Sequence, residues 1–288
     1  MKYAFFPGCV LEGAAKENYI ATTKVAKALG IELVEIPGWI CCGASHAQDI
    51  DELTITAINA RNISLAEAMG LPLLTVCNTC TLMLRKAKTQ LDNGEKEKVN
   101  QILAKANIHY AGTSDITHLL WVLVGEYGLA KLKAMVRRPL TGLKVAAYYG
   151  CHLLRPPAIM NFEDYANPQS LEKLIIALGA EPIEFSAKLQ CCGFHATYPA
   201  ETDVVRITGQ INQSAVKAGT DCIVTPCPLC QMSLDINQQE GQVVVGCSQE
   251  MPVLHLSQLI GLALGFSPAD LGINMLVSGR EHLLARLS

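Results

Sequence analysis

The 288-residue sequence predicts an α/β protein made of two tandem duplicated domains, each with a small parallel sheet flanked by helices and related to the other by pseudo-twofold symmetry. Two observations lead to this fold class. Short apolar runs alternate with longer helical patterns along the chain, as they do in parallel α/β units with right-handed crossovers. Ten of the twelve cysteines fall into two sets with matching spacing, which indicates an internal duplication.

Each half repeats one order of predicted elements. A first strand ends at a Gly-Cys turn, a second leads toward Cys-Cys-Gly, and a third runs into Cys-x-x-Cys, with a helix after each. The predicted strands cover residues 3–6, 32–36 and 73–76, then 145–149, 182–185 and 222–225. The predicted longer helices cover residues 21–29, 53–69 and 116–127, then 170–178, 203–217 and 254–265.

Residues 136–142 form the natural linker between the halves, so the predicted domains are residues 1–138 and 139–288. Hydrophobic residues make up 50% of the chain and charged residues 17%, which is enough apolar material for a buried core. The formal net charge of −3 excludes a basic protein, and we expect no nucleic-acid partner. The sequence shows no secretory signal pattern and no apolar run of spanning length, so we expect a cytoplasmic protein.

The cysteines are the strongest functional signal. The first set is Cys9, Cys41, Cys42, Cys77 and Cys80, and the second is Cys151, Cys191, Cys192, Cys227 and Cys230. Each cysteine group follows the carboxyl end of a predicted strand, and in open α/β sheets that edge is where ligands bind. The cytosol keeps thiols reduced, so metal or redox chemistry explains so many cysteines better than disulfides do.

The spacing favours iron–sulfur clusters over zinc. Thiolates select zinc, copper(I) and iron–sulfur clusters, and a structural zinc site often uses two Cys-x-x-Cys pairs. Each half instead offers five thiols with a single Cys-x-x-Cys, and its adjacent cysteine pair suits two different irons better than one zinc ion. An ordinary cubane takes four cysteines, so a fifth means a spectator thiol or an unusual cluster. A zinc-stabilised scaffold without redox activity is the alternative.

The surroundings of the cysteines suit an anionic cluster. Predicted helices follow both Cys-x-x-Cys sequences, one over residues 81–88 and one beginning near Gln231. A helix N-terminus carries partial positive charge and free N–H groups, which favour thiolates. Gly43 and Gly193, directly after the cysteine pairs, allow the backbone to approach closely.

The doubled pattern Cys-x31–39-Cys-Cys-Gly-x34-Cys-x2-Cys resembles the CCG-domain family, and the member type it looks most like is the B-type subunit of heterodisulfide reductase. The resemblance implies two noncubane 4Fe-4S clusters, one per motif, each held by the five cysteines of its set. It implies that the clusters face a shared cavity, where a disulfide is cleaved or formed by paired one-electron transfers. It also implies a ferredoxin-like iron–sulfur subunit of the C type as partner, with a flavoprotein subunit as a further candidate.

One departure from the family opens a second interpretation. In members from methanogens the first cysteine pair is often followed by proline, whereas here Cys42 is followed by Gly43 and Ala44. This looks more like relatives such as the E-type succinate or fumarate:quinone oxidoreductases, in which the subunit passes electrons to quinone. The substrate is therefore a disulfide or thiol, or a quinone. Peripheral attachment to the cytoplasmic face of the membrane through the complex goes with the second interpretation.

Three histidines and an arginine lie next to the cysteine motifs. We identify His152 and His195 as candidate catalytic residues that donate hydrogen bonds to sulfur or protonate a product thiolate, with structural packing as the alternative. His46 is a weaker candidate for the same role. Arg155 is a candidate clamp for an anionic substrate, and a salt bridge is its plainer interpretation.

The remaining matched residues are interpreted as structural. His118 and His255 occupy equivalent places in the two halves, which the duplication explains, and we assign them no chemistry. Cys222 lies in a predicted buried strand and Cys247 follows a glycine in another. A free cysteine behaves there as a small apolar residue.

Overall fold

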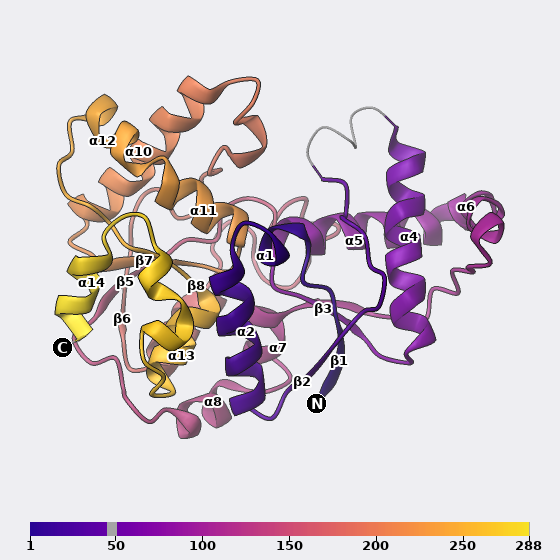
Figure 1. Ribbon diagram of the computed structural model, residues 1–288, viewed down its shortest axis with the longest axis horizontal. Helices are drawn as coiled ribbons and strands as arrows, with labels where there is room; N and C mark the ends of the chain where they lie inside the picture. The colour runs from indigo at the N-terminus through magenta and orange to yellow at the C-terminus, as the bar shows by residue number, and fades with distance from the viewer. Residues whose placement is uncertain (45–50, 288) are drawn as a thin grey trace.

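The computed structural model describes residues 1–44 and 51–287, and its framework is two four-stranded parallel sheets (Figure 1). The first sheet has the order β2-β1-β3-β4 and the second the matching order β6-β5-β7-β8. The strands of the first are β1 (Lys2–Phe5), β2 (Glu32–Glu35), β3 (Leu73–Thr75) and β4 (Ile116–His118). Those of the second are β5 (Lys144–Ala147), β6 (Glu181–Ile183), β7 (Cys222–Thr225) and β8 (Val253–His255). The repeated order confirms the predicted duplicated α/β fold.

The fourth strand of each sheet differs from the prediction, which began a helix there. Ile116 pairs with Leu73 and His118 with Thr75, so residues 116–118 extend the sheet before the helix begins. Val253 and His255 do the same beside β7. Each of these three-residue strands continues directly into an apolar helix, so the hydrophobic pattern does not separate strand from helix.

Helices pack around both sheets. The first half contains α1 (Cys9–Glu12), α2 (Lys16–Ala28), α4 (Glu52–Ala68), α5 (Asn78–Gln90), α6 (Lys96–Leu103), α7 (Leu119–Val124) and α8 (Leu129–Met135). The second contains α9 (Ser170–Ala177), α10 (Glu201–Lys217), α11 (Pro228–Ile236), α12 (Gln238–Val245), α13 (Leu256–Ala263) and α14 (Arg280–Leu287). Helices α5 and α11 begin three residues earlier than predicted.

That earlier start places one cysteine of each Cys-x-x-Cys inside a helix. Cys77 and Cys227 are the N-cap residues of α5 and α11 and have the same backbone angles, φ −129° and ψ 121°. Cys80 and Cys230 therefore lie in the first helical turn. Pro228 is favourable at the first helical position, where the missing N–H costs no helical hydrogen bond.

Both hydrophobic core clusters contain residues of the two halves. Helix α13 of the second half packs on α2 of the first, and α7 of the first packs on α9 of the second. Figure 1 shows α2 and α13 side by side. A buried hydrogen bond of 2.8 Å joins Thr22 Oγ1 to Ser257 Oγ within the first of these contacts. Helices of one half therefore pack on helices of the other, and these contacts fix the two sheets relative to each other.

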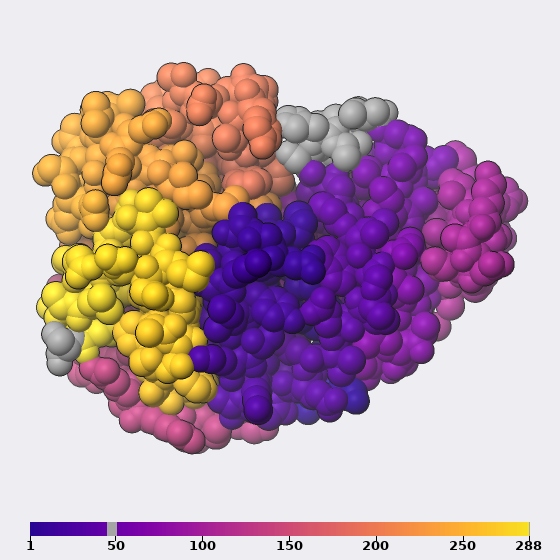
Figure 2. All heavy atoms as spheres, viewed as in Figure 1, coloured from indigo at the N-terminus to yellow at the C-terminus, as the bar shows by residue number. Residues whose placement is uncertain are grey.

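The halves also meet along the surface. Figure 2 shows the indigo N-terminal part in continuous contact with the yellow C-terminal part.

Within the described ranges, no helix combines the length and apolar character that a membrane crossing requires.

Candidate functional site

The strand ends bring the predicted cysteines of each half together. In the first half the Sγ atoms of Cys9 and Cys41 lie 3.5 Å apart, and those of Cys42 and Cys80 lie 3.6 Å apart. In the second half the Sγ atoms of Cys151 and Cys191 are separated by 3.8 Å. All twelve cysteines of the chain are free thiols in the structure.

Each set runs from the protein interior to the surface. The second cysteine of each pair and both cysteines of each Cys-x-x-Cys are buried: Cys42, Cys77 and Cys80 in one half, Cys192, Cys227 and Cys230 in the other. The remaining members, Cys9, Cys41, Cys151 and Cys191, are partly or fully exposed. A group bound by one set would be anchored on its buried side and open on the other.

Glycines make room for the buried sulfurs. A Cβ atom at Gly8 would lie 3.0 Å from Cys80 Sγ, and one at Gly150 would lie 3.0 Å from Cys230 Sγ. Both glycines have positive φ, 78° and 68°, a conformation that other residues rarely adopt. These two positions therefore require glycine for both backbone and space.

Thiols packed this closely cannot all ionise without added positive charge. The pKa of Cys80 is raised by the neighbouring Cys42 sulfur, then by Cys77 and by burial. The pKa of Cys230 is raised in the same way by Cys192, then by Cys227 and by burial. Iron ions of a bound cluster would supply the charge that stabilises the thiolates.

The cysteines of the first set surround one cavity. All five of them line its wall, and its volume is about 90 Å³. Its other walls include Phe194, His195, Pro228 and Leu229 of the second half, so the cavity lies between the halves.

The two cysteine sets meet between the halves. Cys77 Sγ lies 3.9 Å from Cys227 Sγ, although both residues are buried and belong to different halves. Beside them, Asn78 Nδ2 donates a 2.9 Å hydrogen bond to the carbonyl oxygen of Tyr149. The second half has Pro228 where the first has Asn78, so this bond has no symmetric counterpart.

Both candidate catalytic histidines lie at this junction. Thr79 Oγ1 is 3.0 Å from His152 Nδ1 and 3.4 Å from His195 Nε2. Thr79 comes from the first half and both histidines from the second. Sequence reasoning missed Thr79, although the difference between Cys-Asn-Thr-Cys and Cys-Pro-Leu-Cys marks it as a position where the copies diverge.

The other candidates have different outcomes. His46 lies outside the described residues. Arg155 is exposed and donates a weak 3.4 Å hydrogen bond to the carbonyl of Leu189. Cys222 is fully buried in β7, as predicted, and burial raises its pKa. The strand predicted before Cys247 is wrong, because residues 238–245 form helix α12, in which Val243 is exposed. Cys247 follows the Gly246 cap of this helix and is half-buried.

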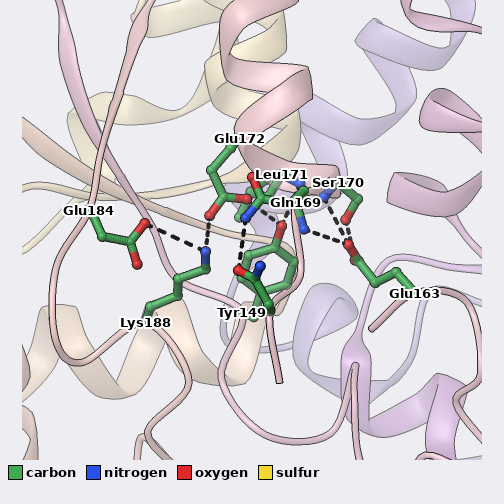
Figure 3. Close-up of polar contacts among 9 residues, drawn as sticks. Tyr149, Glu163, Gln169, Ser170, Leu171, Glu172, Glu184 and Lys188 are labelled. Atoms are coloured by element: carbon green, nitrogen blue, oxygen red, sulfur yellow. Dashed lines mark hydrogen bonds and ion pairs between the residues drawn. The ribbon is translucent and has the colours of Figure 1, made fainter. Parts of the chain in front are cut away.

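A buried polar network supports the second cysteine set (Figure 3). Lys188 Nζ lies 2.5 Å from Glu172 Oε1, and the Tyr149 hydroxyl donates a 2.5 Å hydrogen bond to Glu172 Oε2. Lys188 and Tyr149 are also joined through the backbone by a 3.1 Å bond from the Tyr149 N–H to the Lys188 carbonyl. Burial, followed by the charge of Glu172, raises the pKa of Tyr149. The network fixes the two segments that lead into Cys151 and Cys191.

Known proteins resemble this chain in sequence and in fold. Residues 3–85 and 145–235 match the family model described as a cysteine-rich domain, CCG. The chain is 52% identical to the 8-methylmenaquinol:fumarate reductase membrane anchor subunit of Wolinella succinogenes, over 95% of both chains. It is 35% identical to the B-type subunit of the ferredoxin/F(420)H(2)-dependent CoB-CoM heterodisulfide reductase of Methanosarcina acetivorans, over 99% of this chain and 97% of that one. A hypothetical protein from Helicobacter pylori has the same fold, with a TM-score of 0.76 at 15% identity, covering 96% of this chain and 51% of that one.

Proposed function

This chain belongs to the CCG cysteine-rich domain family and is a homologue of the B-type subunit of heterodisulfide reductase over nearly its whole length, and we propose that it is the iron–sulfur subunit of a redox complex that exchanges electrons with a membrane quinone. The observation that carries the quinone assignment is the 52% identity, over 95% of both chains, to a subunit named for methylmenaquinol:fumarate reductase. The quinone-linked role, the alternative in the sequence analysis, thereby becomes the first candidate.

The ten cysteines of the two sets are the ligands of two clusters in this proposal. Each set would hold one noncubane 4Fe-4S cluster, with its buried cysteines on the inner side and its exposed cysteines at the opening. When bound, such clusters carry electrons one at a time. Cys77 and Cys227 cap the N-termini of α5 and α11, where the partial positive charge of the helix favours thiolates.

His152 and His195 would meet the substrate at the junction of the halves. Both approach Thr79, whose hydroxyl orients them from the first half. The apolar residues Phe194 and Leu229 lie beside His195 on the second-half wall of the cavity that the first cluster would fill, and the substrate would approach the cluster along this wall. This combination suits a flat substrate with an apolar body and a polar oxygen at its edge.

The partners follow from the same proposal. A C-type iron–sulfur subunit or a flavoprotein subunit would connect this chain to the oxidant or reductant at the other end of the complex. The subunit would lie at the cytoplasmic face of the membrane, held there by the complex.

The test is anaerobic purification followed by metal analysis and assay. We expect about eight iron atoms per chain if two four-iron clusters form. The complex, reduced with a viologen, should transfer electrons to a menaquinone analogue. Protein that contains zinc and no iron would contradict the proposal.

Disulfide reduction is the second candidate, and the match along almost the entire chain to the B-type subunit of heterodisulfide reductase favours it. The same reduced complex is offered a series of disulfides in place of the quinone. Turnover with a disulfide and none with the quinone would replace the first candidate by the second.

A further inference from the structure

Two buried histidines outside the substrate cavity occupy equivalent places in the halves. His118 ends β4 and caps α7, and His255 ends β8 and caps α13. Neither side chain has any solvent exposure. The duplication accounts for their matching positions but not for the contacts that they make.

Each histidine forms a hydrogen bond to the opposite half. The Nε2 atom of His118 lies 3.1 Å from the carbonyl oxygen of Pro226. The Nε2 atom of His255 lies 3.1 Å from the carbonyl oxygen of Val76. A carbonyl oxygen only accepts, so Nε2 carries the proton in both rings.

The second ring nitrogen fixes the tautomer. His118 Nδ1 accepts from the Leu120 N–H at 3.1 Å, and His255 Nδ1 accepts from the Ser257 N–H at 3.3 Å. Each ring therefore bonds its own half through Nδ1 and the other half through Nε2. Burial lowers the pKa of His118 to about 3 and that of His255 to about 4, so both rings are neutral near pH 7.

The two carbonyl groups occupy a sensitive place in the chain. Pro226 directly precedes Cys227, and Val76 directly precedes Cys77. The Sγ atoms of these two cysteines are 3.9 Å apart across the junction. Because of this, a small movement of either carbonyl would change the separation of the Cys-x-x-Cys turns.

We propose that His118 and His255 form a reciprocal clasp that sets the distance between the two Cys-x-x-Cys turns, and so the coupling between the clusters bound there. The histidines are positioning residues, since they act through Pro226 and Val76 and touch no reacting atom. The part that concerns clusters rests on the proposed function. The clasp itself concerns only the protein.

Two substitutions at each histidine test its Nδ1 and Nε2 hydrogen bonds separately. His118→Asn keeps a capping oxygen near the position of Nδ1, because asparagine is a favoured N-cap, but it is too short to reach Pro226. His118→Gln places an amide N–H near the position of Nε2 and restores the reach. His255→Asn and His255→Gln form the matched pair in the other half. Asp51→Ala is the control, because Asp51 caps α4 through Leu53 and Thr54 within the first half.

The first measurement is hydrogen–deuterium exchange of the purified holoprotein. In His118→Asn we expect faster exchange in residues 226–230 of the opposite half, and in His255→Asn faster exchange in residues 76–80. The glutamine variants should return toward the wild-type rates. If His118→Asn loosens only its own helix α7, as a purely local cap would, the clasp is wrong.

The second measurement is electron paramagnetic resonance in the redox state in which both clusters are paramagnetic. We expect the asparagine variants to lose part of the spin–spin splitting at unchanged iron content, and Asp51→Ala to keep it. Splitting that is the same in all variants would overturn the link between clasp and coupling. Wild-type protein without two clusters would contradict the proposed function alone, since the exchange measurement still decides on the clasp.

Discussion

The Sγ atoms of Cys77 and Cys227 lie 3.9 Å apart, although 150 residues separate them in the chain. Both cap a helix with the same backbone angles, and both follow the third strand of their own half. The duplication therefore does more than provide two binding sites. It places the buried ends of the two cysteine sets against each other, and under the proposed function this contact would give electrons a short route from one half to the other.

The ligand assignment predicts selective loss of clusters. Cys42→Ala and Cys192→Ala should each remove about half of the iron, because each cysteine belongs to one set of five. Cys222→Ala is the matched control, since Cys222 is equally buried but lies within β7. Iron and sulfide analysis with the visible absorption spectrum measures the outcome. A cluster lost in Cys222→Ala would overturn the assignment.

The sequence predicts the cysteine sets because their spacing is repeated and strand ends of a parallel sheet share one edge. It does not predict the contacts at the junction. His118 and Pro226 are 108 residues apart, and His255 and Val76 are 179 apart, so no local pattern connects them. Thr79 was missed for the same reason, because its partners lie in the other half. The fourth strands escaped prediction because apolar residues continue directly into a helix.

Thr79 tests the role of the histidines at the substrate cavity. Thr79→Val keeps the shape of the side chain but removes the hydroxyl that lies near His152 and His195. We expect a roughly tenfold or greater loss of turnover with the quinone analogue, which corresponds to about 1.4 kcal/mol of lost positioning. Iron content should not change.

Thr79→Ser is the matched control, because serine retains the hydroxyl group. It should keep most of the activity. Equal activity in the valine and serine variants would mean that the hydroxyl does not orient the histidines during turnover.

The buried pair of Lys188 and Glu172 predicts a large asymmetric effect on stability. Lys188→Met leaves the Glu172 carboxylate buried without its cation, and breaking a buried pair costs about 3–5 kcal/mol. The double variant Lys188→Met with Glu172→Gln removes both charges and should recover much of the loss. Urea unfolding of the anaerobic protein measures both. If the double variant is as unstable as the single one, the uncompensated charge is not the cause.

Asp235 predicts a pH dependence of stability that can be assigned to one residue. Burial, partly offset by hydrogen bonds from the Val277 and Ser278 N–H groups, raises its pKa from 3.8 to about 6. The folded protein thus holds the proton more tightly than the unfolded chain does. The stability that this protonation contributes is fully present below the ordinary pKa of 3.8 and is lost as the pH rises through about 6.

The size of this effect follows from the shift of about two pKa units, which corresponds to roughly 3 kcal/mol. Asp235→Asn removes the titrating group, although it also exchanges one acceptor oxygen for a donor. The comparison therefore uses the slope of the unfolding free energy between about pH 4 and pH 6, where the folded and unfolded chains differ in bound protons, and not its absolute value. We expect the wild-type stability to fall more steeply with rising pH than that of Asp235→Asn. Parallel slopes would show that Asp235 titrates alike in the folded and unfolded chains, and that the bonds to residues 277 and 278 fully offset its burial.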